Sequence, residues 1–249
     1  MSNHRLILEY DGAGFNGWQA QPEASGARTV AGELARALVT VTGERPRLNA
    51  AGRTDAGAHS LGQTVSFSLA REVAPDELRR SLNGVLPGDV AVVSSDLVGD
   101  RFHARFSART RHYRYLVENR EARPALLRQR AWHVRQPLDV PAMRAAAQRL
   151  LGRRDLGAFG RDPGGRSTVR SLQRLRIRRL GGVAGAVLAF ELSADAFLYG
   201  MVRRIVGFLV EVGLHRRSPG DVETVLRSGP VPGIRVAPAH GLYQLRAEY

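Results

Sequence analysis

Apolar residues recur in two rhythms along the first half of the chain. Alternation of apolar and polar side chains predicts strands at 6–10, at 65–69 and around 90–93. Helical spacing predicts an amphipathic helix over 30–41. A proline followed by two acidic residues predicts a second, short helix over about 75–82, because helix starts favour both. The predicted order is therefore strand, helix, strand, helix, strand.

The second half repeats this mixture of elements. Strands are predicted at 131–134 and 188–192, and a strand with a basic face is predicted at 174–178, where apolar residues alternate with arginines. A helix is predicted from an Asp cap at 139 to a glycine stop at 152. A longer helix is predicted over 197–212.

Turn-forming residues define two further segments. Residues 218–221, Ser-Pro-Gly-Asp, have the form of a capping box and predict the start of a short helix. Residues 162–167 are rich in Gly and Pro, and we expect a mobile loop there. On periodicity alone, the chain is predicted to be an α+β protein with mixed elements in both halves.

Charge is the most informative feature of the composition. The 249-residue chain has 37 basic and 23 acidic residues, a formal net charge of +14, and every one of these cations is Arg. A guanidinium forks onto phosphate and stacks on bases, so the excess indicates a polyanionic partner such as nucleic acid. A GC-rich genome would explain the choice of Arg over Lys, but it would not explain the net excess.

Other features of the composition exclude some classes of protein. The chain has no Cys, which excludes disulfides and thiolate metal sites and is compatible with a reducing cytosol. No signal-peptide core precedes the first predicted strand. The longest apolar runs are far too short to span a bilayer. We therefore expect a cytoplasmic protein without a membrane segment.

The segment 49–60, Asn-Ala-Ala-Gly-Arg-Thr-Asp-Ala-Gly-Ala-His-Ser, places small residues around one cation and one carboxylate. In an extended segment Arg53 and Asp55 point to the same side. Gly52 and Gly57 can take backbone angles that other residues reach only at a cost. Two interpretations stay open from these residues. One is a tight turn held by an Asx-type hydrogen bond, and the other is a reactive carboxylate with room for a large substrate.

A second segment, 100–108, interleaves arginines with Phe and His rings. Such interleaving suits a surface that binds phosphates and bases, although a partly buried strand with a solvated face would show it too. In the strand expected next, Tyr113 and Tyr115 share one face, and burial in the core would explain them both.

One cation stands out in the predicted helix over 197–212. Gly200, Arg203 and Gly207 lie on a single stripe of that helix. The two glycines allow another backbone to approach closely, and Arg203 projects from the same stripe. The residue is therefore either a solvated Arg beside a packing contact or part of a site.

Several strings, in this order, resemble the signatures of the TruA-type tRNA pseudouridine synthases. They are EYDG…F.GWQ from position 9, GRTDAG followed by Ala-His from 52, N..LP.D from 83, FHARFSA from 102 and AFLYGMVRRIVG from 196. The closing segment 237–245 resembles the last strand of that family, so the resemblance covers nearly the whole chain. The chain departs from the family pattern beside Arg203, at Tyr199, Gly200 and Arg204. The resemblance therefore implies less about RNA contacts there than about Arg203 itself.

The resemblance implies a fold of two ferredoxin-like (RRM-like) halves, with joined, mainly antiparallel sheets and helices on one side. Residues 1–105 would carry the GRTDAG loop, and residues 106–249 would complete an RNA-binding active-site cleft between the halves. It also implies a homodimer that isomerises uridine to pseudouridine at positions 38, 39 and 40 in the anticodon stem–loop of tRNA. No metal and no cofactor are implied.

The resemblance also assigns roles to individual residues. Asp55 would be the catalytic nucleophile, since a carboxylate is ionised at neutral pH, and Arg203 would be its counter-ion. Tyr113 would stack on the flipped base and can act as acid or base, while Arg53 would brace the gap that the base leaves. Candidates for phosphate contacts are His103, Arg105 and Arg109.

Two other functions fit parts of the sequence. A non-catalytic RNA-binding protein of the same fold would share the Arg excess and the aromatic strands, but the intact set of Asp55, Arg53, Tyr113 and Arg203 favours an enzyme. An Asp-nucleophile hydrolase normally needs Mg²⁺ and a cluster of acids, whereas GRTDAG supplies one acid. The sequence leaves open whether Asp55 attacks C1′ of the sugar or C6 of the base.

Overall fold

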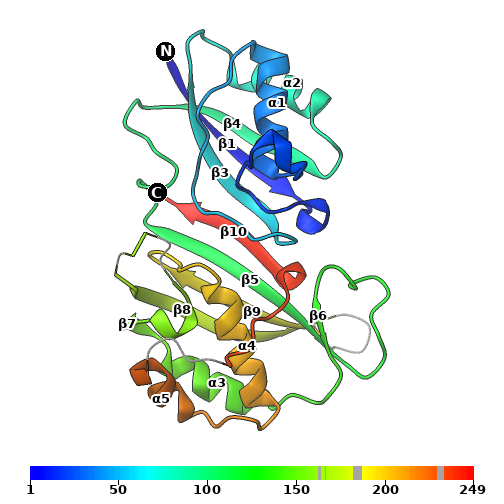
Figure 1. Ribbon diagram of the computed structural model, residues 1–249, viewed down its shortest axis with the longest axis vertical. Coiled ribbons are helices and arrows are strands. Elements are labelled where there is room, and N and C mark those ends of the chain that lie inside the picture. Colours follow the sequence, from blue (N-terminus) through cyan, green and yellow to red (C-terminus); the bar gives the residue numbers. More distant parts are fainter. Residues whose placement is uncertain (162–163, 166, 182–186, 229–232) are drawn as a thin grey trace. The chain divides into compact units, whose positions relative to one another are not determined.

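The computed structural model describes residues 1–161, 164–165, 167–181, 187–228 and 233–249. Its chain forms two compact units, whose strands and helices are shown in Figure 1. Unit 1 consists of Met1–Arg109 together with Tyr243–Tyr249, and unit 2 consists of Thr110–Leu242. The division after residue 105 that was expected from the sequence stays a prediction.

Unit 1 is built on a sheet with the strand order β4-β1-β3-β10. Strand β1 (Ser2–Tyr10) pairs antiparallel with both β3 (His59–Leu69) and β4 (Val90–Val98). Strand β10 (Leu242–Glu248) pairs parallel with β3, and the two-residue β2 (Asn49–Ala50) pairs antiparallel with it. The predicted strands at 6–10, 65–69 and 90–93 are parts of β1, β3 and β4, so all three are confirmed.

Two helices cover one face of this sheet. Helix α1 (Val30–Thr42) begins where the Thr29 hydroxyl accepts a hydrogen bond from the Gly32 amide, and α2 (Pro75–Val85) begins with the expected proline. Apolar residues of the helices and of alternate strand positions form one core. Its fully or almost fully buried members include Leu6, Leu8, Leu34, Leu38, Phe67, Leu78 and Leu82. Each such side chain contributes roughly 1.5–3 kcal/mol through burial.

Unit 2 is built on a sheet with the strand order β5-β9-β8-β7. Strand β5 (Thr110–Asn119) pairs antiparallel with β9 (Val187–Ala194), which pairs antiparallel with β8 (Val169–Leu180). Strand β7 (Gly152–Asp155) extends the sheet beyond β8, and the short β6 (Trp132–Val134) pairs parallel with β5.

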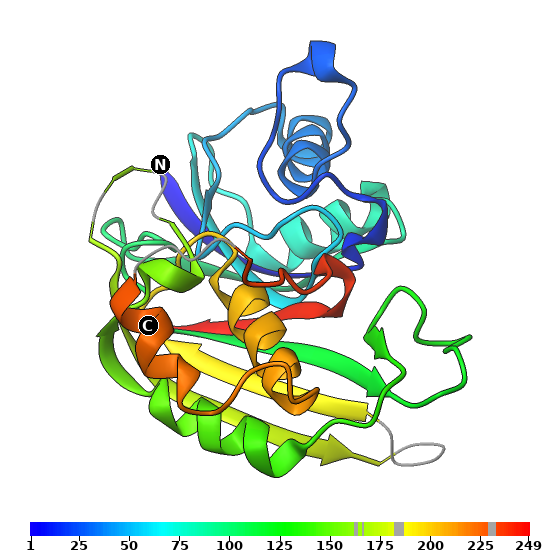
Figure 2. The same ribbon diagram turned by 60° about the horizontal axis from the view of Figure 1, so that its bottom comes forward.

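Three helices pack on one face of this second sheet, as Figure 2 shows. They are α3 (Val140–Arg149), α4 (Met201–Gly213) and α5 (Asp221–Ser228). The Asp139 carboxylate caps α3 as predicted, through a 2.9 Å hydrogen bond from the Ala142 amide. None of the helices in the part of the chain that the structure describes is long and apolar enough to cross a membrane.

Helix α3 ends at Arg149, and the glycine at 152 that was predicted to stop it begins β7 instead. Two other differences between the predicted elements and the structure have clear local causes. Helix α4 begins at Met201 instead of residue 197, because Gly200 adopts a left-handed conformation with φ 72° and serves as the N-cap. Strand β7 was not predicted, since its sequence Gly-Arg-Arg-Asp contains no apolar alternation. The loop predicted at 162–167 includes 162–163 and 166, which lie outside the described residues.

The basic face predicted for β8 is confirmed. Leu175 and Ile177 are buried against the helices, whereas the alternating arginines on the other face are exposed. These arginines are Arg174, Arg176 and Arg178.

We predict that Gly207→Ala destabilises the protein although alanine favours helices. A Cβ atom at Gly207, in α4, would overlap the backbone carbonyl oxygen of Arg235. Overpacking of this kind costs about 1–3 kcal/mol. We therefore expect a lower Tm in thermal unfolding followed by circular dichroism, by about 2–4 °C for each kcal/mol.

Gly84→Ala is the matched control, because Gly84 also lies in a helix but a Cβ atom there meets nothing within 4 Å. Its Tm should stay the same or rise, since alanine is favoured over glycine in a helix by up to about 1 kcal/mol. An unchanged Tm for Gly207→Ala would contradict the close backbone contact.

Candidate active site

The GRTDAG segment forms the loop between β2 and β3, at residues 52–57. Asp55 is half-buried and Arg53 is exposed. The loop closes locally through a 3.1 Å hydrogen bond from the Ala58 amide to the Asp55 carbonyl oxygen. Gly57 has a φ of 80°, a conformation that a residue with a side chain rarely adopts. The segment is thus a tight turn closed by a backbone hydrogen bond, and its Asp55 side chain is only half-buried.

A second loop, residues 11–18, packs along the GRTDAG loop. The Trp18 amide donates to the Thr54 carbonyl oxygen at 3.1 Å, and the Gly57 amide donates to the Phe15 carbonyl oxygen at 3.2 Å. These two backbone bonds hold the GRTDAG loop on either side of Asp55. The hydroxyl groups of Tyr10 and Thr54 are also hydrogen-bonded to each other, at 2.8 Å.

Glycines make this close packing possible. A Cβ atom at Gly17 would lie 2.8 Å from the Thr54 carbonyl oxygen, and its φ of 88° already favours glycine. A Cβ atom at Gly12 would overlap the Ala58 carbonyl oxygen. Nothing in the local sequence pattern of this Gly-rich loop shows which distant segment it contacts.

His59 follows the GRTDAG loop and is almost fully buried, with 2 % of its surface exposed. Its Nδ1 accepts a hydrogen bond from the Gly12 amide at 3.1 Å and lies 2.9 Å from the Asp11 carboxylate. Its ring stacks on the Tyr243 ring with the centroids 4.8 Å apart. The imidazole therefore helps to join the two loops to β10, inside unit 1.

The predicted phosphate-binding segment, residues 100–108, lies over the face of the unit 1 sheet that α1 and α2 do not cover. The Asn3 side chain donates to the carbonyl oxygens of Gly99 and Phe102, and the Ala104 amide donates to the Ser66 hydroxyl. The segment is a series of turns, so the alternative of a partly buried strand is wrong. Its hydrogen bonds go to the side chains of Asn3 in β1 and Ser66 in β3 and thereby hold it against the face of the sheet.

Cations and rings of this segment reach solvent. Arg105 and Arg109 are exposed and His103 is half-buried. Phe106 is 72 % exposed, with its ring centroid 4.4 Å from that of His103 and 5.6 Å from the guanidinium carbon of Arg105. This arrangement of cations around exposed rings suits phosphates and bases.

Tyr113 and Tyr115 lie in β5 on the helix-covered face of unit 2. The two residues are 7 % and 0 % exposed, respectively. Tyr115 donates a 2.6 Å hydrogen bond to the Pro238 carbonyl oxygen, and burial raises the pKa of its phenol, so that it stays neutral. Tyr113 packs edge-on against the Phe197 ring, with the centroids 4.8 Å apart. The expected burial of Tyr115 is confirmed, and Tyr113 is nearly as buried.

Arg203 projects from α4 and is half-buried. Its Nε donates to the Ala237 carbonyl oxygen at 2.7 Å, while the Ala237 amide donates back to the Arg203 carbonyl oxygen. Gly207 allows the backbone at Arg235 to approach, as its place on the stripe predicted. Arg203 is thus not a solvated surface cation, and its guanidinium is anchored by the segment that leads into β10.

Asp55 and Arg53 belong to unit 1, whereas Tyr113 and Arg203 belong to unit 2. Their assembly into one site stays a prediction. Among the residues that the structure describes, no group of three or more His, Cys, Asp or Glu side chains could hold a metal ion.

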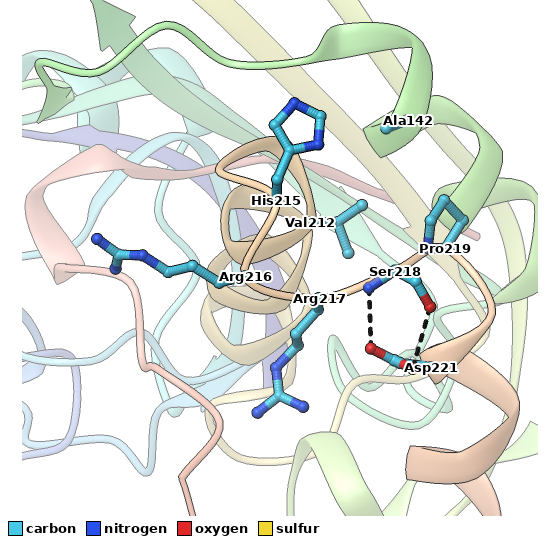
Figure 3. A pocket seen from close by; sticks show the side chains of 8 residues that line it. All are labelled: Ala142, Val212, His215, Arg216, Arg217, Ser218, Pro219 and Asp221. Atoms are coloured by element: carbon cyan, nitrogen blue, oxygen red, sulfur yellow. Dashed lines mark hydrogen bonds between the residues drawn. The ribbon is translucent and has the colours of Figure 1, made fainter.

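A pocket of about 480 Å³ lies in unit 2, between the end of α4 and the start of α5. Its basic side chains are those of His215, Arg216 and Arg217, and they point in different directions (Figure 3). Arg217 is bonded to Glu211 at 2.6 Å. The pocket contains none of the predicted site residues, and its cations do not converge on one point as an anion site would require.

Comparison with known proteins identifies the family. The profile of a family described as tRNA pseudouridine synthase matches residues 6–107 and 146–249. A protein from Moorella thermoacetica is 41 % identical over 251 residues, covering 98 % of both chains. A protein from Bradyrhizobium sp. is 42 % identical over 254 residues, covering 100 % of both. Both carry the name tRNA pseudouridine synthase A. The chain therefore belongs to the tRNA pseudouridine synthase family.

Proposed function

We propose that this protein isomerises uridine to pseudouridine at positions 38, 39 and 40 in the anticodon stem–loop of tRNA, with Asp55 as the nucleophile. Family membership supports the reaction and its tRNA substrate. The observation that supports Asp55 is its place as the one carboxylate of a loop whose backbone is held on both sides. A nucleophile must be presented in a fixed orientation, and this loop provides that.

The reaction balances without an external reactant. The bond between N1 of the base and C1′ of the sugar breaks, the detached base rotates, and a bond forms between C5 and C1′. The proton on C5 is lost and N1 gains one, so no electrons are exchanged with another molecule. The Asp55 carboxylate would attack either C1′ or C6 and would be released when the new carbon–carbon bond has formed.

The remaining site residues have roles that follow from their chemistry. Arg203 would stabilise the ionised Asp55 as a counter-ion. Tyr113 would stack on the flipped base and exchange a proton with it, and Arg53 would fill the gap in the stem. Three side chains would contact phosphates. They are the exposed Arg105 and Arg109 and the half-buried His103.

We further propose that the two units correspond to two ferredoxin-like halves with an RNA-binding cleft between them. The protein would act in the cytoplasm as a homodimer. The net charge of +14 supports binding to a polyanion such as tRNA. The direct test is to incubate the protein with unmodified tRNA transcripts and to map pseudouridine chemically. Product at positions 38–40 is expected, and its absence from these positions would refute the proposal.

The first prediction from this mechanism concerns Asp55→Asn. An amide is a poor nucleophile, so turnover should fall by about 10³-fold or more while tRNA binding survives. Pseudouridine formation under single-turnover conditions measures the rate, and filter binding measures affinity. Asp76→Asn is the control, because its side chain is 85 % exposed on α2 and its rate should be that of the wild type. Turnover within tenfold of the wild type for Asp55→Asn would remove it from the nucleophile role.

The second prediction concerns metal dependence, which is tested with a chelator. We predict that activity on a minimal stem–loop persists in excess EDTA, because the mechanism gives no step to a metal ion. A stem–loop that folds without Mg²⁺ must be used, since Mg²⁺ can help by folding the RNA. Loss of the product in EDTA, with recovery on adding Mg²⁺ or Zn²⁺, would point instead to metal-assisted chemistry.

The third prediction concerns Arg203→Ala. Removing the cation makes an ionised carboxylate less favourable, so the acid limb of the pH–rate profile should move upward, by about one to three pH units. Binding should fall less than catalysis, because the proposed partner of Arg203 is a side chain and not a phosphate.

Arg204→Ala is the matched control for this shift. Arg204 is also half-buried in α4 and also donates to a backbone carbonyl oxygen, that of Tyr199 at 3.4 Å. It should keep the wild-type acid limb. If both variants show the wild-type profile, Arg203 does not serve Asp55, and Arg53 becomes the better candidate for its counter-ion.

A further inference from the structure

Arg28 connects three segments of unit 1 through one guanidinium group. Its two terminal nitrogens fork onto the Asp89 carboxylate at 2.7 and 2.8 Å, and its Nε donates to Glu33 at 3.0 Å. The guanidinium carbon also lies 4.2 Å from the centre of the Phe15 ring. Only a planar guanidinium can fork onto a carboxylate and at the same time stack flat on a ring, so Lys could not reproduce these contacts together.

The network stays charged at neutral pH. The hydrogen bond with Asp89 raises the pKa of the Arg28 guanidinium. Burial opposes ionisation of Glu33, but hydrogen bonds from Arg36 and Arg28 outweigh it and lower the pKa of that carboxyl group. The pairs therefore persist under the conditions in which the protein would work.

The backbone of the same residues holds the loop at 11–18. The Asn16 amide donates to the Arg28 carbonyl oxygen at 2.8 Å, and the Asp11 amide donates to the Asp89 carbonyl oxygen at 3.0 Å. Between these two points lies Phe15, 4 % exposed beneath the Arg28 guanidinium. Arg28 and Asp89 thus bind the backbone of this loop through their carbonyl oxygens, and the Arg28 guanidinium covers its buried Phe15 ring.

The loop at 11–18 in turn fixes the backbone on both sides of Asp55. Its Phe15 carbonyl oxygen receives the Gly57 amide, and its Trp18 amide binds the Thr54 carbonyl oxygen. These bonds are one residue before Asp55 and two residues after it. A continuous set of short contacts therefore runs from Arg28 through Phe15 to the Asp55 backbone.

We propose that Arg28 is a positioning residue for Asp55, acting through Phe15 and the 11–18 loop, with Asp89 and Glu33 holding the guanidinium in place. This inference rests on the proposed role of Asp55 as nucleophile. Arg28 touches neither the substrate nor the reacting atoms in this proposal. It sets the place of the backbone from which the carboxylate projects.

The expected sizes of the effects on folding stability and on reaction rate distinguish a positioning role from a purely structural one. The Arg28 and Asp89 side chains are 37 % and 31 % exposed, so solvent screens their ion pair, although its bidentate geometry and its link to Glu33 make it stronger than an ordinary surface pair. A misplacement of a reacting group by 1 Å, in contrast, can cost about 10²-fold in rate. Removal of the Arg28 side chain should therefore affect the chemical step far more than it affects the fold.

The test compares Arg28→Ala, Arg28→Lys and Arg217→Ala with the wild type on a tRNA stem–loop. For Arg28→Ala, we expect the single-turnover rate to fall by about 10- to 100-fold, with the RNA dissociation constant changed less than about threefold. Arg28→Lys should recover only a small part of the rate, because it restores the charge without the fork or the stacking.

Arg217→Ala is the matched control, because it removes the same kinds of contact elsewhere. Arg217 binds Glu211 at 2.6 Å, and its guanidinium carbon lies 5.5 Å from the centre of the Phe208 ring. The single-turnover rate of Arg217→Ala per folded molecule should equal that of the wild type. All rates are measured well below the Tm of each variant, so that loss of folded protein does not enter.

Amide hydrogen exchange provides a second readout that does not depend on activity. The Trp18 and Gly57 amides carry the two bonds beside Asp55, so both should exchange faster in Arg28→Ala and remain protected in Arg217→Ala. Unchanged exchange at these amides would overturn the proposal. So would a wild-type single-turnover rate for Arg28→Ala, or a full recovery of the rate in Arg28→Lys.

An equal loss of RNA affinity and rate would also overturn it, because the loop would then be an RNA contact. These failures are distinct from failure of the proposed function. If Asp55→Asn is inactive and Arg28→Ala has the wild-type rate, only the positioning role is wrong. If Asp55→Asn remains active, the nucleophile assignment itself is wrong.

Discussion

The candidate site depends on two backbone hydrogen bonds that join loops far apart in the sequence. Trp18 binds the carbonyl oxygen of Thr54, and Phe15 receives the amide of Gly57, so the chain is held on both sides of Asp55. Such bonds need the two backbones to approach without side chains between them, which explains Gly12 and Gly17. A buried backbone amide or carbonyl group without a partner is costly, so this pairing is strongly favoured once the loops meet. The candidate site is therefore built from main-chain geometry, and in the proposed function Asp55 would supply the chemistry.

Polar side chains extend this arrangement into the rest of unit 1. His59 links the loops to Tyr243 of β10 by stacking, and the Tyr10 hydroxyl joins Thr54 to β1. Arg28 and Asp89 are paired with each other and bind the backbone of the loop at 11–18. Buried polar groups are stable only when they are satisfied, so each of these contacts constrains its neighbours. In unit 2, Arg203 and Tyr115 are anchored in a similar way by the carbonyl oxygens of Ala237 and Pro238.

Local sequence rules predicted most elements because they depend on nearby residues. Thr29 and Asp139 cap α1 and α3, and the apolar positions of β8 and β9 face the helices as their alternation indicated. The exceptions have local causes as well. Helix α4 begins later than predicted because Gly200 adopts a left-handed conformation. Strand β7 has no apolar residue, so no alternating pattern predicts it. The turns of the segment at 100–108 were not predicted, because the segment binds Asn3 and Ser66, which are distant in the sequence and which no local pattern reveals.

By itself, the sequence determined most of the elements, the basic character of the chain and, through its motifs, the family and the residue types of the candidate site. Tertiary structure alone decided which segments meet. It placed the Gly-rich loop against GRTDAG, buried His59 and Tyr113, tied Arg203 to Ala237 and formed the network around Arg28. The physical reason is the separation in sequence between the residues that interact. Helical and strand periodicity arise from residues a few positions apart, whereas these contacts join residues tens of positions apart and form only when a shared core brings them together.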